Sequence, residues 1–460
     1  MTKNFSLTVV LRFLGSALLA CLMMVEVCGQ SIAPNAQGAP ARPDRDGPFA
    51  QEVNPDTNRR FINEHSFDDP AFRKRRHDEV GPLGPQGPKR VRMVYLIPSD
   101  KPYRKDYQIA IGNAILHLQN FYQAEMGSGY SFSTHSPIVE VYRTSHPANY
   151  YSTFPNNGPN DFFNSVLADG FALSGGGFND PNNRWIYYID ADPACNQGVG
   201  GTSGVALLPA NDLRGLTGEQ NIPPCGGSPD NGGICRWIGG LGHELGHAFG
   251  LPHPPGCDPN GACTGGTFAS NSLMYLGYSL YPGTYLLQDD KNHLFNTGFF
   301  TVLSLDGPRF NCAGNPIDDQ RVFVRVQYLD FFGREPDQGG WDFWTGTITQ
   351  CGSDQICIAN KRVDVSRAFW ESDEFRGKSI AFGMLNSNPP PEYVNSRFVE
   401  LCYNIHLQRA PNAPPDNNFD GYNYWLGQLN ACTGAGGDYG CYHGLIRAFL
   451  ESNEFRARFP

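Results

Sequence analysis

Residues 243–253 read His-Glu-Leu-Gly-His-Ala-Phe-Gly-Leu-Pro-His, and this segment says most about what the chain builds. Residues four apart on an α-helix share a face, so His243 and His247 can point at one metal ion. Gly250 can adopt a positive φ, which ends the helix and lets the chain return with His253 as a third ligand. Three imidazoles with one open coordination position are typical of a catalytic zinc site.

Glu244 follows the first of these histidines directly. It is close enough to take the proton of a zinc-activated water, so we expect it to act as a general base. The alternative is a pair of buried histidines in an ordinary helix. That alternative accounts for a bare His-Glu-x-x-His, but the longer pattern fixes five residue types at set spacings.

The extended motif resembles the signature of the metzincin metallopeptidases. A second segment, Asn271–Tyr278 (NSLMYLGY), resembles the methionine-containing turn of that family and begins 18 residues after His253. The resemblance covers roughly residues 88–310 and places Met274 beneath the metal. It implies an α+β fold, with a mixed twisted sheet, an active-site helix and a smaller C-terminal subdomain.

The sequence around Met274 looks most like the matrixin branch of the family. Leu276 stands where the astacin and serralysin branches place a metal-contacting tyrosine, so the chain departs from their pattern. By the resemblance, Tyr275 or Tyr278 can line the pocket and hydrogen-bond to a reacting oxyanion. The alternative for both tyrosines is packing in the wall of the pocket.

The resemblance implies a secreted zinc metalloendopeptidase that cleaves protein or peptide substrates with one catalytic zinc. Two other functions remain open. One is a zinc hydrolase that acts on a non-peptide bond with the same scaffold. The other is a surface- or matrix-binding protein in which the peptidase domain is vestigial.

Hydrophobic patterning predicts the elements around this motif. Arg90–Pro98 is apolar on both faces and should be a central strand, and Lys105–Gly127 should be a helix with Asn113 and Gln119 away from its apolar face. By the resemblance, Gly204–Pro209 should be the edge strand beside the cleft, along which a substrate strand pairs. Further elements are expected as strands at 137–144 and 184–190, a helix from about 288 to 299, and long loops at 145–183 and 211–233.

The N-terminal segment 1–29 carries Lys3 and Arg12 before an apolar run and predicts a secretory signal peptide. We therefore expect an extracellular protein, with the periplasm or outer surface as alternatives. A lipid anchor at Cys21 is the less favoured alternative, because the residues after it stay apolar. Nothing downstream is long and apolar enough for a transmembrane segment.

Residues 30–88 are polar and rich in proline and charge, which fits either a pro-segment or a disordered tail. No cysteine lies between Cys28 and Cys195, so a cysteine cannot hold the zinc latent from this segment. Asp68 or Asp69 could take that role. The catalytic domain would then span 89–312.

The region after residue 320 repeats itself, which predicts two copies of one helical unit at 320–385 and 392–460. Arg334 matches Arg409, and the segment RAFxESxEFR occurs at 367–376 and 447–456. The region resembles a bacterial helical domain of unknown function that is distantly like phycobilisome linkers. We expect an all-α module for binding a cell-surface or polymer target, or for packing, with the two arginines as structural contacts.

Cysteine usage also points to an oxidising compartment, because 11 of the 13 cysteines follow the signal region. One arrangement of the first six pairs Cys225 with Cys235, Cys257 with Cys263, and Cys195 with Cys312, although spacing alone does not fix connectivity. Each repeat should close its own disulfide (Cys351–Cys357 and Cys432–Cys441), which leaves Cys402 free.

The bulk charge of −10 and the pI of about 5.6 argue against nucleic acid as a partner through a basic patch. Calcium remains an open cofactor: Asp190, Asp192 and Asp230 are available, but no calcium-loop spacing is present. No calcium site is therefore assigned.

Overall fold

The computed structural model describes residues 88–195, 197–202, 204–219, 233–257, 263–264, 266–303, 305, 312, 314–375, 391–432 and 437–459. The predicted signal peptide, the lipid-anchor alternative at Cys21 and the segment carrying Asp68 and Asp69 lie outside these residues. Among the described helices, none is long and apolar enough to cross a membrane.

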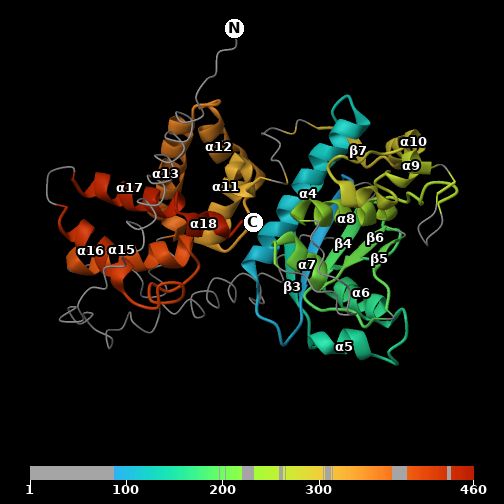
Figure 1. Cartoon of the computed structure of the whole chain (residues 1–460), viewed down its shortest axis with the longest axis horizontal. Helices are drawn as coiled ribbons and strands as arrows, with labels where there is room; N and C mark the ends of the chain where they lie inside the picture. Colours follow the sequence, from blue (N-terminus) through green and yellow to red (C-terminus); the bar gives the residue numbers. More distant parts are fainter. Residues whose placement is uncertain are drawn as a thin grey trace, which may run out of the picture. The chain divides into compact units, whose positions relative to one another are not determined.

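A five-stranded sheet in the order β3-β1-β4-β6-β5 forms the centre of the N-terminal region (Figure 1). β1 is buried along nearly its whole length, as its uninterrupted apolar run predicts. Only β5 runs antiparallel to its neighbour. The strands are β1 (Arg90–Ile97), β3 (Thr134–Arg143), β4 (Asn183–Ile189), β5 (Gly200–Thr202) and β6 (Val205–Leu208).

The prediction for the edge strand was wrong. Segment 204–209 does contain a strand, β6, but β6 pairs with β4 on one side and with β5 on the other. The edge is therefore β5, whose three residues are Gly200, Gly201 and Thr202. Glycine is depleted in strands, so this triplet carries no strand signal in the sequence.

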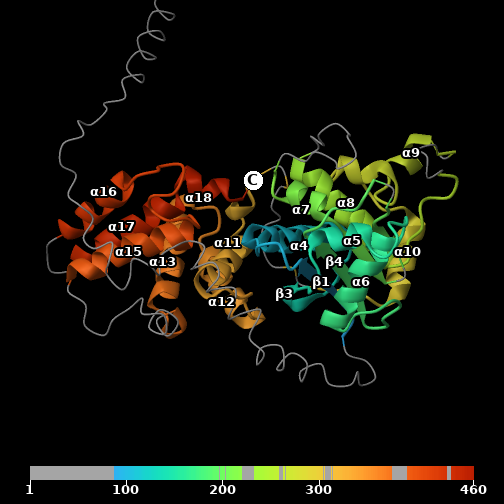
Figure 2. The same ribbon diagram turned by 90° about the horizontal axis from the view of Figure 1, so that it is seen from below.

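Helices cover both faces of the sheet (Figures 1 and 2). α4 (Lys105–Met126) and α8 (Gly233–Ala248) share one apolar core with alternate β1 residues such as Met93 and Tyr95. α6 (Asp161–Ser174) packs on the opposite face with Val94 and Leu96. This period of two along β1 is what a strand buried between two helical layers requires.

The expected long loops contain helices. α5 (Ala148–Thr153) and α6 fall within 145–183, and α7 (Ala210–Leu216) begins where the second loop was expected. The remaining short elements of this region are β2 (Tyr130–Phe132), β7 (Phe300–Val302), α9 (Gly266–Ser270), the 3-10 helix η1 (Leu276–Leu280) and α10 (Gln288–Thr297).

The C-terminal region is helical in the residues described. Its elements are η2 (Pro316–Asp318), α11 (Gln320–Gln327), the π-helical turn η3 (Tyr328–Phe332), α12 (Gln338–Thr349), α13 (Gln355–Glu371), α15 (Pro391–His406), α16 (Asp420–Asn430), α17 (Gly437–Leu450) and α18 (Asn453–Ala457).

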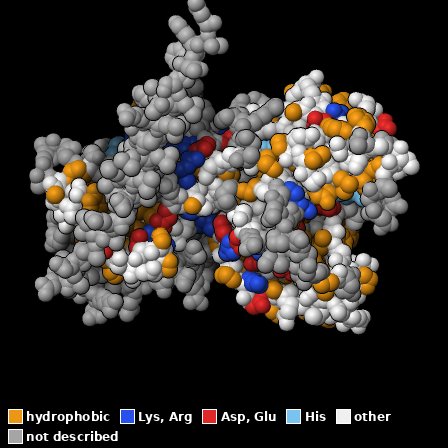
Figure 3. Space-filling view, in the orientation of Figure 1, with side chains coloured by type: hydrophobic (Ala, Val, Ile, Leu, Met, Phe, Trp, Pro, Cys, Tyr) orange, Lys and Arg blue, Asp and Glu red, His pale blue; other side chains and the backbone are white. Residues whose placement is uncertain are grey.

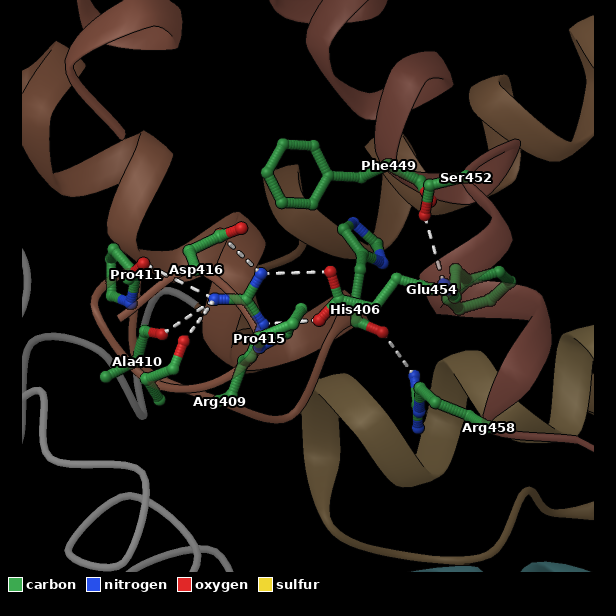
Figure 4. A network of polar contacts seen from close by, with 12 residues as sticks. His406, Arg409, Ala410, Pro411, Pro415, Asp416, Phe449, Ser452, Glu454 and Arg458 are labelled. Carbon is green, nitrogen blue, oxygen red and sulfur yellow. Dashed lines mark hydrogen bonds and ion pairs between the residues drawn. The ribbon is translucent and has the colours of Figure 1, made fainter. Parts of the chain in front are cut away.

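The two repeat arginines make equivalent ion pairs. Arg334 pairs with Glu374 at 2.8 Å, and Arg409 pairs with Glu454. Figure 4 shows that Arg409 is also surrounded by acceptors of its own loop, because it donates to Asp416 and to the backbone carbonyls of residues 410, 411 and 413. Arg409 therefore connects its loop to α18, and Arg334 makes the corresponding ion pair with Glu374, which fits the structural role predicted for both arginines.

A buried polar network joins α11 to α4. Arg325 is fully buried and pairs bidentately with Glu335, at 2.7 Å for both hydrogen bonds. The same guanidinium donates to the Gln108 and Ile109 carbonyls of α4, at 2.9 and 2.8 Å, and to Asn113 Oδ1 at 3.4 Å. Planar guanidinium groups suit such multiple, fixed acceptors.

Two polar residues of α4 depart from the prediction made for them. Asn113 and Gln119 are buried, whereas the helical pattern placed both of them away from the apolar face. Asn113 faces Arg325, and the Gln119 side-chain amide donates to the Phe132 carbonyl at 2.8 Å. More faces of α4 are thus buried than in a helix at the surface of an isolated domain.

Charged side chains of both signs lie close together in the middle of the face shown in Figure 3. Arg456 pairs with Asp318 at 2.7 Å, and Arg458 pairs with the fully buried Asp330 at 2.9 Å. Lys105 of α4 also reaches Asp330, at 3.3 Å. The Lys105–Asp330 pair adds to the polar contacts between the helical region and α4, whereas the two arginine pairs lie within the helical region.

Disulfides link several of these elements. Cys257–Cys263, Cys351–Cys357 and Cys432–Cys441 are present, as predicted, and Cys402 is free and buried. Cys235 pairs with Cys312, 77 residues away, so the arrangement that paired Cys225 with Cys235 and Cys195 with Cys312 was wrong. Cys195 is also in a disulfide.

Candidate metal centre

The turn after α8 brings the third histidine back to the helix. Gly250 has φ of +96°, a conformation that other residues rarely adopt. The Leu251 amide donates to the Gly246 carbonyl at 2.9 Å, which closes the C-terminal turn of the helix. His253 then lies opposite the helix face that carries His243 and His247.

The three imidazoles point their Nε2 atoms at one another. His247 Nε2 lies 3.0 Å from His243 Nε2 and 3.2 Å from His253 Nε2. The Nδ1–H groups of His243 and His247 donate to the carbonyls of Leu273 and Leu251, both at 2.8 Å. These second hydrogen bonds fix the tautomer, so the inward-facing Nε2 atoms carry lone pairs.

This arrangement fits a zinc ion. Zinc–imidazole bonds of about 2.0–2.1 Å in tetrahedral geometry put two ligating nitrogens roughly 3.3 Å apart. Lone pairs facing one another at this range repel unless a proton or a cation lies between them. The three histidines could therefore hold a metal ion. Among the described residues, they form the group of three or more potential ligands whose ligating atoms lie close enough together.

Burial keeps the imidazoles of His243 and His247 neutral. Burial, together with the neighbouring His247 and His253, lowers the pKa of His243 to about 4. Burial also lowers the pKa of His247. Neutral imidazole is the form that binds a metal, so the ligands are prepared for binding at neutral pH.

Glu244 lies beside the ligands and is held by the edge strand. Its Oε2 accepts a hydrogen bond of 2.6 Å from the Gly201 amide. Burial raises the pKa of Glu244 to about 7, although the Gly201 hydrogen bond and Arg236 act in the opposite direction. A carboxylate with a pKa near the working pH can both accept and return a proton.

Gly201 could not be recognised as part of the site from the sequence. A Cβ at this position would overlap the Glu244 backbone carbonyl and contact His247, so only glycine lets β5 approach α8 so closely. The adjacent pair Gly200-Gly201 was the one available signal. It could not be interpreted without knowing that β5 is the edge strand.

Met274 and the tyrosines lie where the methionine-containing segment meets the histidines. Met274 is fully buried, and its sulfur packs against Gly246, where a Cβ would overlap it. The Tyr275 ring lies 5.7 Å from the His253 ring, and the Tyr278 ring lies 5.5 Å from the His243 ring. Tyr275 is 4% exposed, whereas Tyr278 is only partly buried.

A cleft of about 370 Å³ opens over the metal centre. α8 forms part of its lining, and the rest comes from η1, the segment from β6 into α7, Val199, His253 and Tyr275. Its lining combines apolar groups with several polar ones, which are Asn211, Asp212, Arg236, Tyr275 and Tyr278. Arg236 and Asp212 were not singled out from the sequence, although Arg236 lies seven residues before His243 and hence on the same helical face.

The acidic residues considered for calcium do not form a comparable site. Asp192 pairs with Arg214 at 2.9 Å. Burial raises the pKa of Asp190, and Asp230 lies outside the described residues. Calcium therefore stays unassigned.

No protein-family profile matches the chain, and no curated protein matches it. Among solved structures, wild-type OgpA from Akkermansia muciniphila is similar, with 21% sequence identity and a TM-score of 0.32 over 49% of this chain and 65% of that chain. Catalytically inactive OgpA in complex with an O-glycopeptide substrate, glycodrosocin, gives 20% identity and a TM-score of 0.32 over 48% and 64% of the two chains. The match thus spans less than two thirds of the OgpA chains, and the function proposed below rests on the geometry of the site itself.

Proposed function

We propose that the chain is a secreted zinc-dependent endopeptidase, whose catalytic part, residues 89–312, resembles the metzincins. One observation carries this proposal. The Nε2 atoms of three histidines converge within hydrogen-bond distance, and the carboxylate of Glu244, on α8, lies beside them. His243, His247 and His253 would hold the metal. When bound, zinc would polarise the scissile carbonyl and make the attacking water more acidic.

Glu244 would move the proton in this reaction. The Gly201 amide occupies Oε2, so we assign Oε1 to accept the proton of the attacking water. The same oxygen would then deliver that proton to the leaving amine, because a pKa of about 7 suits both directions of transfer. The Gly201 hydrogen bond would keep the carboxylate oriented throughout.

Tyr278 is the better placed of the two tyrosines to act on the substrate. It lines the cleft, and its ring lies against His243. Its hydroxyl would donate to the oxygen that becomes negatively charged as the carbonyl is attacked. Tyr275 is nearly fully buried, so we assign it to supporting His253.

The proposed helical module, 320–385 and 392–460, would bind or pack rather than catalyse. Its two repeat arginines are occupied by ion pairs, and its contacts with α4 support packing against the catalytic part. A cell-surface or polymer target remains a hypothesis that attachment of the full chain to cells or polymer would test.

The deciding experiment measures metal content and proteolysis on the same purified protein. We expect one zinc per chain and cleavage of casein or gelatin that a zinc chelator abolishes and added zinc restores. An O-glycopeptide belongs in the substrate panel, since OgpA was solved with one. Zinc with cleavage of a non-peptide bond alone would favour the alternative hydrolase, and zinc-free protein would refute the metal centre.

Glu244→Gln supplies the matched control. It is nearly isosteric and is not a ligand, so the variant should bind zinc as the wild type does. Loss of a general base typically costs about 10²–10⁴-fold in rate. Full activity in this variant would refute the role assigned to Glu244, whereas inactivity of the wild type with zinc bound would favour a vestigial peptidase domain.

A further inference from the structure

The cleft continues along α8 beyond the metal centre. Arg236 lies seven residues before His243, which corresponds to two helical turns on the same face. Arg236, Trp237 and Gly240 all line the cleft, together with His243 and Glu244. The metal centre and a guanidinium thus share one continuous surface.

The guanidinium of Arg236 is directed along the helix toward the metal centre. A Cβ built on Gly240 would lie 3.1 Å from Arg236 Nη1, so the arginine side chain lies over this glycine. Gly240 precedes Glu244 by four residues, or roughly 6 Å along the helix axis. The absence of a side chain at 240 is what leaves the space in which the guanidinium lies.

Two aromatic rings hold the guanidinium there. Its carbon lies 4.1 Å from the Trp237 ring centroid and 5.0 Å from the Tyr278 ring centroid. Contact with ring faces leaves the N–H groups at the edge of the guanidinium to make hydrogen bonds. Arginine carries five such donors, so it can bind a carboxylate in addition to a neighbour within the protein.

Resting on the proposed peptidase function, we infer that this part of the cleft is a specificity subsite that binds an acidic side chain of the substrate through Arg236. An extended peptide advances about 3.3 Å per residue, so a substrate attacked at the metal centre brings its first or second neighbouring residue to Arg236. A carboxylate there can accept two parallel hydrogen bonds. An apolar side chain would instead cover the guanidinium without offering it an acceptor, at a cost in binding.

Asp212 sharpens this preference. It belongs to α7 and lines the same cleft, where its negative charge repels an acidic substrate side chain that comes close to Asp212. A basic substrate side chain would meet the opposite arrangement, with Arg236 repelling it beside the metal centre.

The test uses a fluorogenic peptide in which Glu, Gln, Lys or Leu is placed in turn at the two positions on each side of the cleaved bond. We expect kcat/KM at one position to be about 10–100-fold higher for Glu than for Gln, the range of a charge-assisted hydrogen bond. Arg236→Gln should reduce this ratio to less than about threefold, and Arg236→Lys should keep part of it, because the charge stays and the paired donors are lost. Arg447→Gln, on α17 and ion-paired with Glu451, is the matched control and should leave the ratio unchanged.

The outcomes separate the two levels of the proposal. If the Gln and Glu peptides were cleaved equally well at every position, the subsite would be overturned and the peptidase function would stand. An unchanged ratio in folded Arg236→Gln would also overturn it. Failure to cleave any peptide with zinc bound would overturn the proposed function, and the subsite with it. Should Arg236→Gln fail to fold, the Lys variant and the wild-type scan still decide the matter.

Discussion

Gly112 of α4 offers a test of the buried network. Alanine usually stabilises a helix relative to glycine, but at this position it should destabilise the protein. Alanine is about 1 kcal/mol better than glycine in a helix interior. At this position, however, a Cβ would overlap the guanidinium of Arg325. That guanidinium makes five hydrogen bonds to Glu335 and α4, and it cannot move without losing some of them.

The net effect of Gly112→Ala follows from these opposing contributions. Breaking a buried ion pair by removing one partner costs about 3–5 kcal/mol, and overpacking by one methyl group costs about 1–3 kcal/mol. Arg325 is displaced and not removed, so we take about 3 kcal/mol as the loss. After the helical gain of about 1 kcal/mol, the free energy of unfolding should fall by roughly 2 kcal/mol.

Thermal unfolding of the full chain measures this directly. For domains of this size, 1 kcal/mol corresponds to about 2–4 °C in Tm, so Gly112→Ala should lower Tm by roughly 4–8 °C. Gly346→Ala in α12 is the matched control, since a Cβ there meets no atom within 4 Å, and it should raise Tm slightly. If Gly112→Ala raised Tm as Gly346→Ala does, the reasoning that Arg325 is fixed in place would be refuted.

Three further predictions follow from the site and from the helical region. Because burial raises the pKa of Glu244 to about 7 and a bound cation would lower it again, kcat/KM should fall as pH drops, with an apparent pKa between about 4.5 and 7 in a pH–rate profile. Tyr278→Phe should lower kcat by about 10²-fold with little change in KM, and equal kcat values for the two enzymes would exclude the hydroxyl from catalysis. Burial lowers the pKa of His406 to about 4 in the folded state. As pH falls, the unfolded chain therefore binds this proton before the folded chain does. The free energy of unfolding should then decrease by roughly 3 kcal/mol between pH 6.5 and pH 4. His406→Phe should flatten that part of a stability–pH curve measured by urea unfolding, and an unchanged slope would show that other groups cause it.

Local spacing made the convergence of the three histidines predictable. His243 and His247 share a helical face whatever surrounds the helix, and Gly250 ends that helix through its own backbone preference. The short cysteine loops, such as Cys257–Cys263, are local in the same sense. The alternation along β1 likewise appears in its sequence before any neighbour is known.

The features that depend on distant partners were not predictable. Cys235 meets Cys312 only after the chain has folded, and no local pattern favours that pairing over Cys225. Arg325 occupies a polar position on a short amphipathic helix, which ordinarily means exposure, yet its partners on α4 bury it completely. Arg236 could have been placed on the ligand face by counting residues, but only Gly240 and the two rings show where its guanidinium lies.

The edge strand β5 has a consequence for redesigning this protein. Gly200 and Gly201 leave two of the three positions of β5 without side chains, and a larger residue at 201 would collide with α8. A substrate lying along β5 would be recognised there through its backbone alone, so this edge would accept many sequences equally well. Engineering a new preference should therefore start from libraries in α8 and η1, with the glycine pair kept constant.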